Sequence, residues 1–324
     1  MKALVLVGGF GTRLRPITYE IPKQLIPLAG RPMLYHVIEQ LPADTEEVIF
    51  ASGYKSDVVA AFLRDHPPRL PARCVAETEP LGTGGGLLNA AAGLTDPFFF
   101  LNSDVIADVD LGALAAFQGR HGGVGSMTLT EVADPSPYGV VAMAPGDRIE
   151  RFVEKPKIEE APSRWINAGL SIWRREVLEL IPRGRPVSWE QEIVPQLLGR
   201  GVYGFQARGY WEDAGTPDRL LHAQRLLFDG GRGGPGTLPK GSHGQGPVAL
   251  GAGVEARGAT FGPYVHLDPG VHVGVGAHVA NSIVMEGSEI GDGASVTDSV
   301  LGPRVRISPG TTVHHQVLGV GAQL

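Results

Sequence analysis

Short apolar runs alternate with segments of helical spacing from Met1 to about Phe228. The runs predicted as buried strands are residues 3–7, 48–51, 74–76 and 98–101, and the segments predicted as helices are residues 33–41, 57–64, 84–92 and 111–117. This alternation is typical of a Rossmann-like α/β domain, in which helices cover a mostly parallel sheet. Because ligands of such domains bind at the carboxyl ends of the strands, we expect functional residues in the segments that follow the apolar runs.

A different pattern begins after residue 228. Eleven of the nineteen residues 229–247 are Gly or Pro, which predicts a linker without a lasting helix or central strand. From 248 to 324 apolar residues recur every six positions, at Phe261, Leu267, Val273 and Val279 and again at Leu301, Ile307 and Val313. This repeat is typical of a parallel β-helix, whose coils have three six-residue sides with the apolar residue inward. We therefore predict two domains, 1–228 and 248–324, the second with about four coils.

Three histidines follow the same six-residue spacing. His266, His272 and His278 could suggest a metal site, but one six-residue step leads to the next side of a triangular coil. Side chains on one side recur only after about eighteen residues, so the three imidazoles point in different directions. We expect surface histidines and no shared metal.

The first apolar run leads directly into a glycine-rich loop. Gly8, Gly9 and Gly11 let backbone N–H groups approach an anion, and Thr12 and Arg13 follow at once. A Walker loop needs a Lys-Ser/Thr pair after its last glycine, and a dinucleotide loop needs Gly-x-Gly-x-x-Gly, so neither fits Gly-Gly-x-Gly-Thr-Arg. An ordinary glycine turn is the plain alternative, which the neighbouring arginines and Pro22-Lys23 disfavour. The loop therefore predicts a binding site for a phosphate chain.

Two aspartates stand where strand-like runs pass into turns. Asp104 ends Leu101-Asn102-Ser103-Asp104, directly after the apolar run 97–101, and Asp213 lies in the stretch 209–217. A carboxylate just past a buried strand, beside a phosphate loop, is well placed to bind Mg²⁺. Each acid alone would suggest only a turn or a helix cap, but together with the loop they predict a shared magnesium site.

Polar groups near two later strands suggest a sugar phosphate. Glu154 and Lys155 follow the strand-like residues 149–153, and Asn167 precedes another strand at 170–173. Lys155 could bind the phosphate, and Glu154 and Asn167 could bind hydroxyls, although a surface ion pair and a turn explain them equally well. Gly84–Gly86, at a predicted helix start, further suggests a ligand lying against the backbone.

Composition and charge exclude several classes of protein. The net charge is −6 and no Lys/Arg block could follow a nucleic-acid backbone, so no nucleic-acid partner is expected. Cys74 is the only cysteine, which excludes an internal disulfide and a multi-cysteine zinc site. The apolar runs are too short for a membrane span or a signal peptide, so we expect a cytoplasmic protein without a membrane partner.

Taken together, the motifs resemble the sugar-nucleotidyltransferase family, the nucleoside-diphosphate-sugar pyrophosphorylases. The matching stretches are residues 8–16, 22–23, 80–83, 101–104, 152–156, 166–169 and 211–215. Many members also carry a C-terminal left-handed hexapeptide β-helix, so the resemblance covers nearly the whole chain. It implies nucleotidyl transfer from an NTP to a sugar 1-phosphate, with pyrophosphate as second product, Mg²⁺ as cofactor and 1–228 as the nucleotidyltransferase domain.

The resemblance also implies roles for individual residues. Those expected to be catalytic are Arg13, Lys23, Asp104 and Asp213, with both aspartates as metal ligands. Those expected to bind the nucleotide are Gly8, Gly9, Gly11, Thr12, Glu77, Pro80 and Gly82. Those expected to bind the sugar phosphate are Gly139, Glu154, Lys155 and Asn167.

Within the family, the motifs look most like those of the mannose-1-phosphate guanylyltransferases, which make GDP-mannose from GTP and mannose 1-phosphate. Glu77 stands where thymidylyltransferases tend to carry glutamine. Guanine presents N1–H and N2–H as adjacent donors, which one carboxylate can accept together, whereas thymine suits an amide. Glu77 therefore favours guanine, although a loop shifted by register could present Glu79 instead.

Other functions stay open at this point. Gln24 favours, mildly, a thymidylyl- or uridylyltransferase acting on glucose 1-phosphate. A catalytically silent sensor of nucleotide sugars is a second alternative, against which the intact Arg13, Lys23, Asp104 and Asp213 argue. An added acyltransferase activity is disfavoured because the β-helix is short and has no long inserted loop. The faces and the open end of the β-helix suggest a homo-oligomer.

Overall fold

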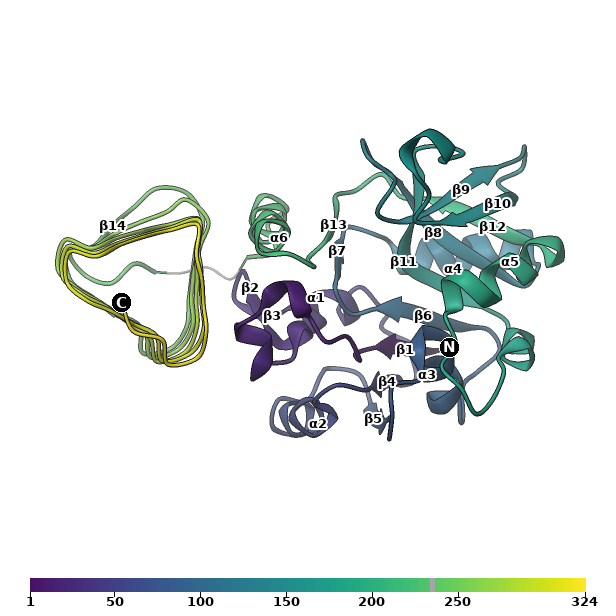
Figure 1. Ribbon diagram of the computed structural model, residues 1–324, viewed down its shortest axis with the longest axis horizontal. Coiled ribbons are helices and arrows are strands. Elements are labelled where there is room, and N and C mark those ends of the chain that lie inside the picture. Colours follow the sequence, from purple (N-terminus) through teal and green to yellow (C-terminus); the bar gives the residue numbers. More distant parts are fainter. Residues whose placement is uncertain (234–236) are drawn as a thin grey trace. The chain divides into compact units, whose positions relative to one another are not determined.

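The computed structural model describes residues 1–233 and 237–324. The predicted linker residues 234–236 lie outside the described residues. The chain divides into two compact units. The first contains Met1–Gly9 and Val37–Trp211, and the second contains Phe10–His36 and Glu212–Leu324 (Figure 1).

A nine-stranded sheet forms the centre of the first unit. Its parallel half contains β6 (Phe98–Asn102), β1 (Lys2–Leu6), β4 (Val48–Ser52) and β5 (Ala72–Ala76), in that order. The other half adds β11 (Trp165–Trp173), antiparallel to β6, with β9 (Gly139–Met143) and β10 (Ile149–Glu154) on one branch and β8 (Gly125–Glu131) and β12 (Val202–Gln206) on another. The predicted α/β class and its four first strands are confirmed.

Helices alternate with these strands. They are α1 (Met33–Ile38), α2 (Ser56–Asp65), α3 (Gly82–Ala90), α4 (Leu111–His121) and α5 (Val194–Leu197), and a short strand, β7 (Val105–Ala107), follows β6. Consecutive residues are buried in β1, β4 and β6, as for Leu4 and Val5 at 0% exposure each, whereas β5 at the edge is partly exposed. Since neighbouring side chains of a strand point to opposite faces, both faces of this part of the sheet are covered.

The second unit begins with a compact N-terminal segment. It has three short 3₁₀ turns at Thr12–Leu14, Ile17–Tyr19 and Lys23–Leu25, followed by the hairpin of β2 (Pro27–Leu28) and β3 (Arg31–Pro32). The short strand β13 (Trp211–Asp213) leads into α6 (Pro217–Asp229). Thr216 caps this helix by accepting a hydrogen bond from the Arg219 N–H at 3.4 Å.

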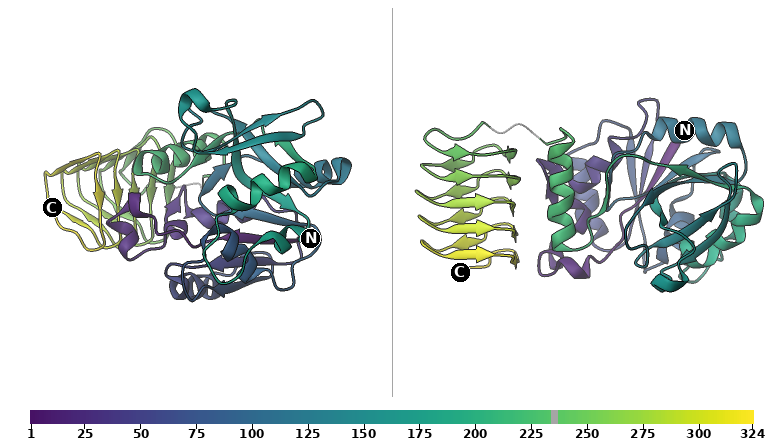
Figure 2. Two further views of the ribbon diagram at one scale, coloured as in Figure 1. Left: turned by 45° about the vertical axis from the view of Figure 1, so that its right-hand side comes forward. Right: turned by 90° about the horizontal axis from the view of Figure 1, so that it is seen from above.

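The C-terminal part of the second unit is a parallel β-helix, as predicted. One side contains β14 (His243–Gly244), β17 (Thr260–Phe261), β20 (His278–Ala280), β23 (Ser295–Thr297) and β26 (Thr312–His314). The next contains β15 (Val248–Leu250), β18 (Val265–Leu267), β21 (Ile283–Val284), β24 (Val300–Leu301) and β27 (Val317–Leu318), and the third contains β16 (Glu255–Ala256), β19 (His272–Val273), β22 (Glu289–Ile290) and β25 (Arg306–Ile307). Seen along the axis in Figure 1 the coils superpose as a triangle, and Figure 2 shows their strands stacked.

Two details of this β-helix differ from prediction. Two of its sides have five strands, so there are more coils than the four expected. The spacing between stacked residues is 17 for most pairs, as from His272 to Glu289, and not 18. Most coils therefore have one five-residue side, and this is why the six-residue spacing of apolar residues in the sequence is interrupted after Val279.

The three evenly spaced histidines lie on three different sides, as expected, but they are not all at the surface. His266 on β18 is only 2% exposed, whereas His272 is more than half exposed. The expectation of surface histidines is therefore wrong for His266. The reason is that the outward side chains of its sheet are covered within the second unit, as Ile283 and Val300 are, at 0% and 1% exposure.

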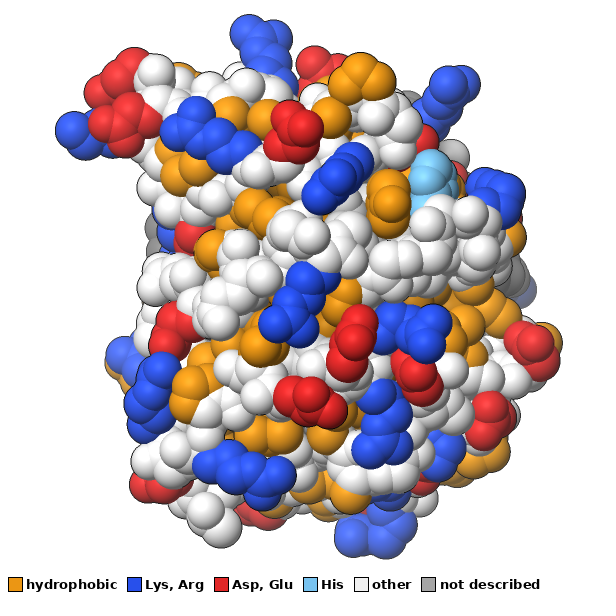
Figure 3. All heavy atoms as spheres, turned by 90° about the vertical axis from the view of Figure 1, so that its right-hand side faces the viewer, with side chains coloured by type: hydrophobic (Ala, Val, Ile, Leu, Met, Phe, Trp, Pro, Cys, Tyr) orange, Lys and Arg blue, Asp and Glu red, His pale blue; other side chains and the backbone are white. Residues whose placement is uncertain are grey.

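The surface carries charges of both signs. On the face drawn in Figure 3, Lys and Arg side chains are interspersed with Asp and Glu, and they form no continuous basic patch. Over the described residues, no helix has the length and apolar character needed to cross a membrane.

Candidate active site

Several predicted site residues meet at the carboxyl edge of the parallel strands. Gly8 and Gly9 continue β1, Glu77 follows β5 directly, and Asp104 lies in the turn after β6. The Ser103 N–H donates to the Leu6 carbonyl at 3.3 Å, which holds the Asp104 turn against the end of β1. This edge is where ligands of α/β sheets bind.

The glycine loop has one glycine that packing does not explain. A Cβ atom on Gly9 would meet no protein atom within 4 Å, so the protein itself does not require glycine there. Gly11 differs, because its φ of +59° is left-handed and its Cβ would lie 2.9 Å from Thr18 Cγ2. Thr18 also donates its hydroxyl to the Gly11 carbonyl at 2.8 Å. The loop is thus fixed at Gly11 and open at Gly9, as binding of an anion by the backbone requires.

The second unit brings together three of the predicted charged groups, Arg13, Lys23 and Asp213, with Arg219, which the sequence did not single out. Lys23 is buried, and its Nζ lies 3.7 Å from Asp213 Oδ1, while Arg219 Nη1 lies 3.5 Å from Asp213 Oδ2. A Cβ atom on Gly215 would lie 2.6 Å from Arg13 Nη2 and 2.9 Å from Asp213 Oδ1, so this glycine makes room for both groups. Thr12 and Arg13 are exposed on the adjoining turn, which the buried Leu14 anchors.

The predicted metal ligands can be tested against this arrangement. Asp104 and Asp213 supply carboxylate oxygens, the donors that Mg²⁺ prefers. Asp104 belongs to the first unit and Asp213 to the second. Within the part of the chain that the structure describes, no three acidic, histidine or cysteine side chains form a metal cluster. Mg²⁺ commonly binds through one or two such carboxylates together with substrate phosphates and water.

Glu77 occupies a niche lined by glycines. Its Oε2 accepts a hydrogen bond from the Leu81 N–H at 3.2 Å, and burial raises its pKa while this bond lowers it. A Cβ atom on Gly53 or Gly86 would lie 3.1 Å from Oε2 or 2.5 Å from Oε1. Gly86 therefore leaves room for the Glu77 carboxylate at the carboxyl end of β5. This carboxylate can accept further hydrogen bonds beside the one from the Leu81 N–H.

The run of three glycines has a different cause from the one expected from sequence. Cβ atoms on Gly84 and Gly85 would lie 3.1 Å from Val187 and 2.9 Å from Leu81, respectively, and Gly86 faces Glu77. Each glycine thus accommodates protein atoms, and the interpretation of a ligand lying against this backbone is wrong. Pro80, before α3, and Gly82, its first residue, are exposed, and the Leu81 carbonyl accepts a hydrogen bond from the Val187 N–H at 2.8 Å.

Three strands bring the predicted sugar-phosphate residues together. Gly139 at the start of β9 is directly opposite Glu154 at the end of β10, and a Cβ atom on it would lie 2.9 Å from Glu154 Oε2. Asn167 lies on β11 at a bulge, next to the residue paired with β9. The sequence suggested that Asn167 precedes a strand, but Asn167 lies inside β11. Its Oδ1 accepts from the Gly169 N–H at 3.1 Å.

Lys155 has a strained backbone at this point. Its φ is +47°, an uncommon value for a residue other than glycine, and its N–H donates to the Tyr138 carbonyl at 2.9 Å. Such strain concentrates at functional sites. The Lys155 side chain is 66% exposed, with Nζ 3.4 Å from Glu154 Oε1, so its charge is available at the rim.

Sequence reasoning missed Glu190. It lies in the π-helical turn Trp189–Ile193, and its Oε2 accepts from the Thr83 hydroxyl at 2.7 Å. Burial raises the pKa of Glu154, and the Glu190 carboxylate raises it further, while Lys155 lowers it. Glu190 thus links the motif at Gly82-Thr83 to the Glu154 site. The local signal, Ser188 before acidic residues, predicts only a helix start.

Comparisons with known proteins agree with this geometry. The Nucleotidyl transferase family matches residues 2–230, and the GMPPB C-terminal domain matches residues 245–324. Mannose-1-phosphate guanylyltransferase 1 of Arabidopsis thaliana is 41% identical over 298 residues, which cover 89% of this chain and 82% of that protein. The mannose-1-phosphate guanyltransferase of Emericella nidulans is 44% identical over 230 residues, which cover 68% of this chain and 62% of that protein.

Solved structures share the fold of the first domain. HddC from Yersinia pseudotuberculosis aligns with a TM-score of 0.59 at 25% identity, over 70% of this chain and 99% of that one. A UDP-glucose pyrophosphorylase complexed with UDP-glucose aligns with a TM-score of 0.63 at 21% identity, over 71% of this chain and 98% of that one. The chain therefore belongs to the nucleotidyl transferase family, with a GMPPB-type C-terminal β-helix.

Proposed function

We propose that this protein is a mannose-1-phosphate guanylyltransferase, which forms GDP-mannose and pyrophosphate from GTP and mannose 1-phosphate. The observation that carries the proposal is the 41% identity to the plant enzyme over 89% of this chain, β-helix included. The geometry supports it, because the open glycine loop, the buried Lys23 and the Glu77 niche supply what a guanosine triphosphate needs.

The reaction requires two anions to meet. An oxygen of the sugar phosphate attacks the α-phosphorus of the nucleotide, that bond forms, and the bond to the departing pyrophosphate breaks in line with it. Positioning and charge neutralisation do most of this work, and no covalent nucleophile is needed. Arg13 and Lys23 supply fixed positive charge that offsets the repulsion between the phosphates.

We expect Asp104 and Asp213 each to supply a carboxylate oxygen to magnesium that binds with the substrate phosphates. When bound, the ion would neutralise charge on the phosphate oxygens, an effect worth several kcal/mol. Asp213 is already paired with Lys23 and Arg219. These two cations hold its carboxylate in place.

The sugar phosphate is recognised around Gly139. Glu154 and Asn167 supply acceptors for sugar hydroxyls, and Lys155 supplies charge for the phosphate. Trp211 closes this region of the first unit, since its Nε1 donates to the Ala168 carbonyl at 3.1 Å and its ring packs edge-on against Tyr138. Two aromatic rings thus border the polar groups, a usual arrangement for a small-ligand site.

One set of rate measurements tests the function. Pyrophosphate release is measured with GTP, dTTP, UTP and ATP against mannose, glucose and N-acetylglucosamine 1-phosphates. We expect GTP with mannose 1-phosphate to be the best pair. If another pair is best, the substrate assignment fails while the reaction class survives, and no turnover with any pair would favour the silent sensor.

The pH dependence of sugar-phosphate use tests the Glu154–Glu190 pair. An ionised Glu154 accepts two hydroxyl hydrogen bonds, so kcat/KM for mannose 1-phosphate falls as the pH drops through the pKa of Glu154. Glu190→Gln removes the nearby negative charge that raises this pKa, and it keeps an oxygen for the Thr83 hydroxyl. We expect the acid limb of the profile to move to lower pH.

Mannose 1-phosphate itself titrates in the same way with wild type and with Glu190→Gln. The shift of the acid limb between the two pH profiles therefore comes from the protein. Glu159→Gln, a change of one exposed acid, is the matched control and leaves the limb in place. An acid limb that stays where it is in Glu190→Gln would separate Glu154 from sugar binding.

We also propose that the protein forms a homodimer through the third side of its β-helix. The outward residues of this side form a polar column of Glu255, His272, Glu289 and Arg306 on successive coils, each more than half exposed. When a second copy runs antiparallel about a twofold axis, Glu255 faces Arg306 and His272 faces Glu289 of that copy. The column is therefore complementary to itself, as an isologous interface requires.

Charge reversal tests this interface. Arg306→Glu places two pairs of like charges across the axis, and we expect monomers by sedimentation velocity at low salt. The double variant Glu255→Arg/Arg306→Glu restores opposite charges and should restore the dimer. A dimer that withstands Arg306→Glu, or a double variant that stays monomeric, would exclude this side as the interface.

A further inference from the structure

The hairpin turn between β2 and β3 has an unusual backbone. Both turn residues have positive φ, at 47° for Ala29 and 99° for Gly30. Two such residues form the tight turn that suits a two-residue hairpin, but the first position normally holds Asn, Asp or Gly. Alanine is disfavoured there because its Cβ crowds the following carbonyl oxygen, so the hairpin's own sequence does not favour its shape. Contacts from elsewhere must hold the turn.

His266 of the β-helix makes one of these contacts. Its Nδ1 lies 2.8 Å from the Gly30 nitrogen and its Nε2 lies 2.7 Å from Asp268 Oδ1. A backbone N–H can only donate, so Nδ1 is the acceptor and Nε2–H donates to the carboxylate. His266 is buried among apolar outward residues of its sheet, and both its nitrogens are satisfied. Its burial is therefore explained by the turn that it holds.

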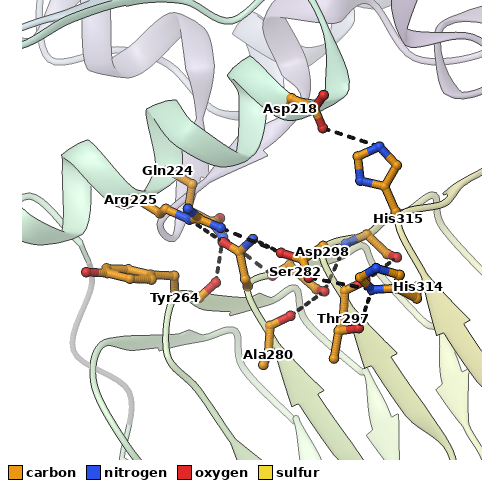
Figure 4. A network of polar contacts seen from close by, with 12 residues as sticks. Asp218, Gln224, Arg225, Tyr264, Ala280, Ser282, Thr297, Asp298, His314 and His315 are labelled. Atoms are coloured by element: carbon orange, nitrogen blue, oxygen red, sulfur yellow. Dashed lines mark hydrogen bonds and ion pairs between the residues drawn. The ribbon is translucent and has the colours of Figure 1, made fainter.

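Gln224 of α6 makes the second contact. Its Oε1 accepts from the Ala29 N–H at 3.3 Å. Its Nε2 donates to the Tyr264 carbonyl at 3.0 Å and the Ser282 carbonyl at 3.4 Å, as Figure 4 shows. Gln224 is fully buried, so one side chain bridges α6, two coils of the β-helix and the turn.

The hairpin of β2 and β3 comes shortly after Lys23 in the chain. Lys23 begins the 3₁₀ turn Lys23–Leu25, and β2 starts two residues after that turn's last residue, Leu25. The Met33 N–H donates to the Ile26 carbonyl at 3.0 Å, which closes the base of the hairpin. At the other end of the ion pair, Asp213 is held by Arg219 at the start of α6, the helix that carries Gln224. Lys23 is thus connected to the hairpin and Asp213 to α6, and Gln224 of α6 contacts the turn of that hairpin.

We propose that His266 and Gln224 are positioning residues for nucleotidyl transfer. By accepting hydrogen bonds from the Gly30 and Ala29 N–H groups, they hold the segment that carries Lys23, so the β-helix sets where the catalytic cation lies. This inference rests on the proposed function, in which Lys23 offsets the charge of the phosphates.

Two substitutions at His266 separate this role from a merely structural one. His266→Leu removes the acceptor, whereas His266→Asn places an amide oxygen near the former Nδ1 position. We expect kcat to fall about tenfold in His266→Leu with KM for GTP changed much less, since a misplaced group costs mostly transition-state stabilisation. His266→Asn should recover most of kcat, and His243→Leu, on an exposed strand of another side, should match wild type.

Hydrogen–deuterium exchange of the Ala29 and Gly30 amides provides a readout that does not depend on activity. Both amides should exchange slowly in wild type and His266→Asn, and the Gly30 amide should exchange fast in His266→Leu. If wild type has no transferase activity, the proposed function fails while the exchange pattern still tests the held turn. Gln224→Met serves if His266→Leu does not fold, and it should expose the Ala29 amide and lower kcat.

Unchanged kcat in a folded His266→Leu would overturn the proposal. So would a His266→Asn protein that regains the slow exchange of Gly30 but not the activity, because the turn would then be held without benefit to Lys23.

Discussion

Asp104→Asn should abolish pyrophosphate formation from GTP and mannose 1-phosphate, with a loss of about 10³-fold or more in kcat. The turn of Asp104 is held against the end of β1 by the Ser103 N–H, so Asp104 lies at the same edge of the sheet as Gly8 and Gly9. Asparagine keeps the size of the side chain and removes the negative charge that a bound cation needs. The measurement is pyrophosphate release at saturating substrates over a range of Mg²⁺ concentrations.

The fold should not change with this substitution, because Asp104 is only partly buried and follows a strand that β1 and β11 hold on both sides. Circular dichroism and the thermal midpoint check this point. Asp57→Asn, at an exposed acid in the first turn of α2, is the matched control and should keep full activity. Near-normal turnover of Asp104→Asn in saturating Mg²⁺ would remove Asp104 from the mechanism.

Glu77→Gln should weaken the preference for GTP over dTTP by about 100-fold in kcat/KM, because a buried polar group that loses its partner discriminates strongly. The carboxylate of Glu77 offers acceptors on both oxygens, which suit the two adjacent N–H donors of guanine. Glutamine replaces one acceptor with a donor, so guanine loses a hydrogen bond and thymine gains a matching edge. The remaining amide oxygen can still accept from the Leu81 N–H, so the loop keeps its shape.

Glu79→Gln is the matched control for this experiment. Glu79 is exposed two residues further along the same loop, and it is the acid that a shifted register would present. A change of preference in Glu79→Gln, with none in Glu77→Gln, would assign base recognition to Glu79. If both variants keep the GTP preference, the base is read elsewhere.

The sequence predicted the parts of the fold that local pattern determines. The four parallel strands, helices α1–α4 and the inward apolar residues of the β-helix follow from periodicity alone, because each is set by burial of one face or stripe. The glycine loop and Asp104 were placed at the strand ends for the same reason. The antiparallel half of the sheet was not predicted, since the partner of a strand depends on chain segments far away in sequence.

Several features of the site could not be derived from neighbouring residues. Gly86 is required by the carboxylate of Glu77, and Glu190 reaches Thr83 across more than a hundred positions of sequence. The 17-residue coil and the buried His266 likewise depend on how coils stack and on what covers them.

By itself, then, the sequence determined which groups this protein has for phosphate chemistry and at which strand ends they lie. Tertiary contacts, in contrast, bury Lys23 beside Asp213 and let His266 and Gln224, from distant segments, hold the turn that follows Lys23. The physical reason is that periodicity and turn chemistry act between near neighbours in the chain. Burial, ion pairing and the hydrogen bonds of side chains instead arise between residues that only folding brings together.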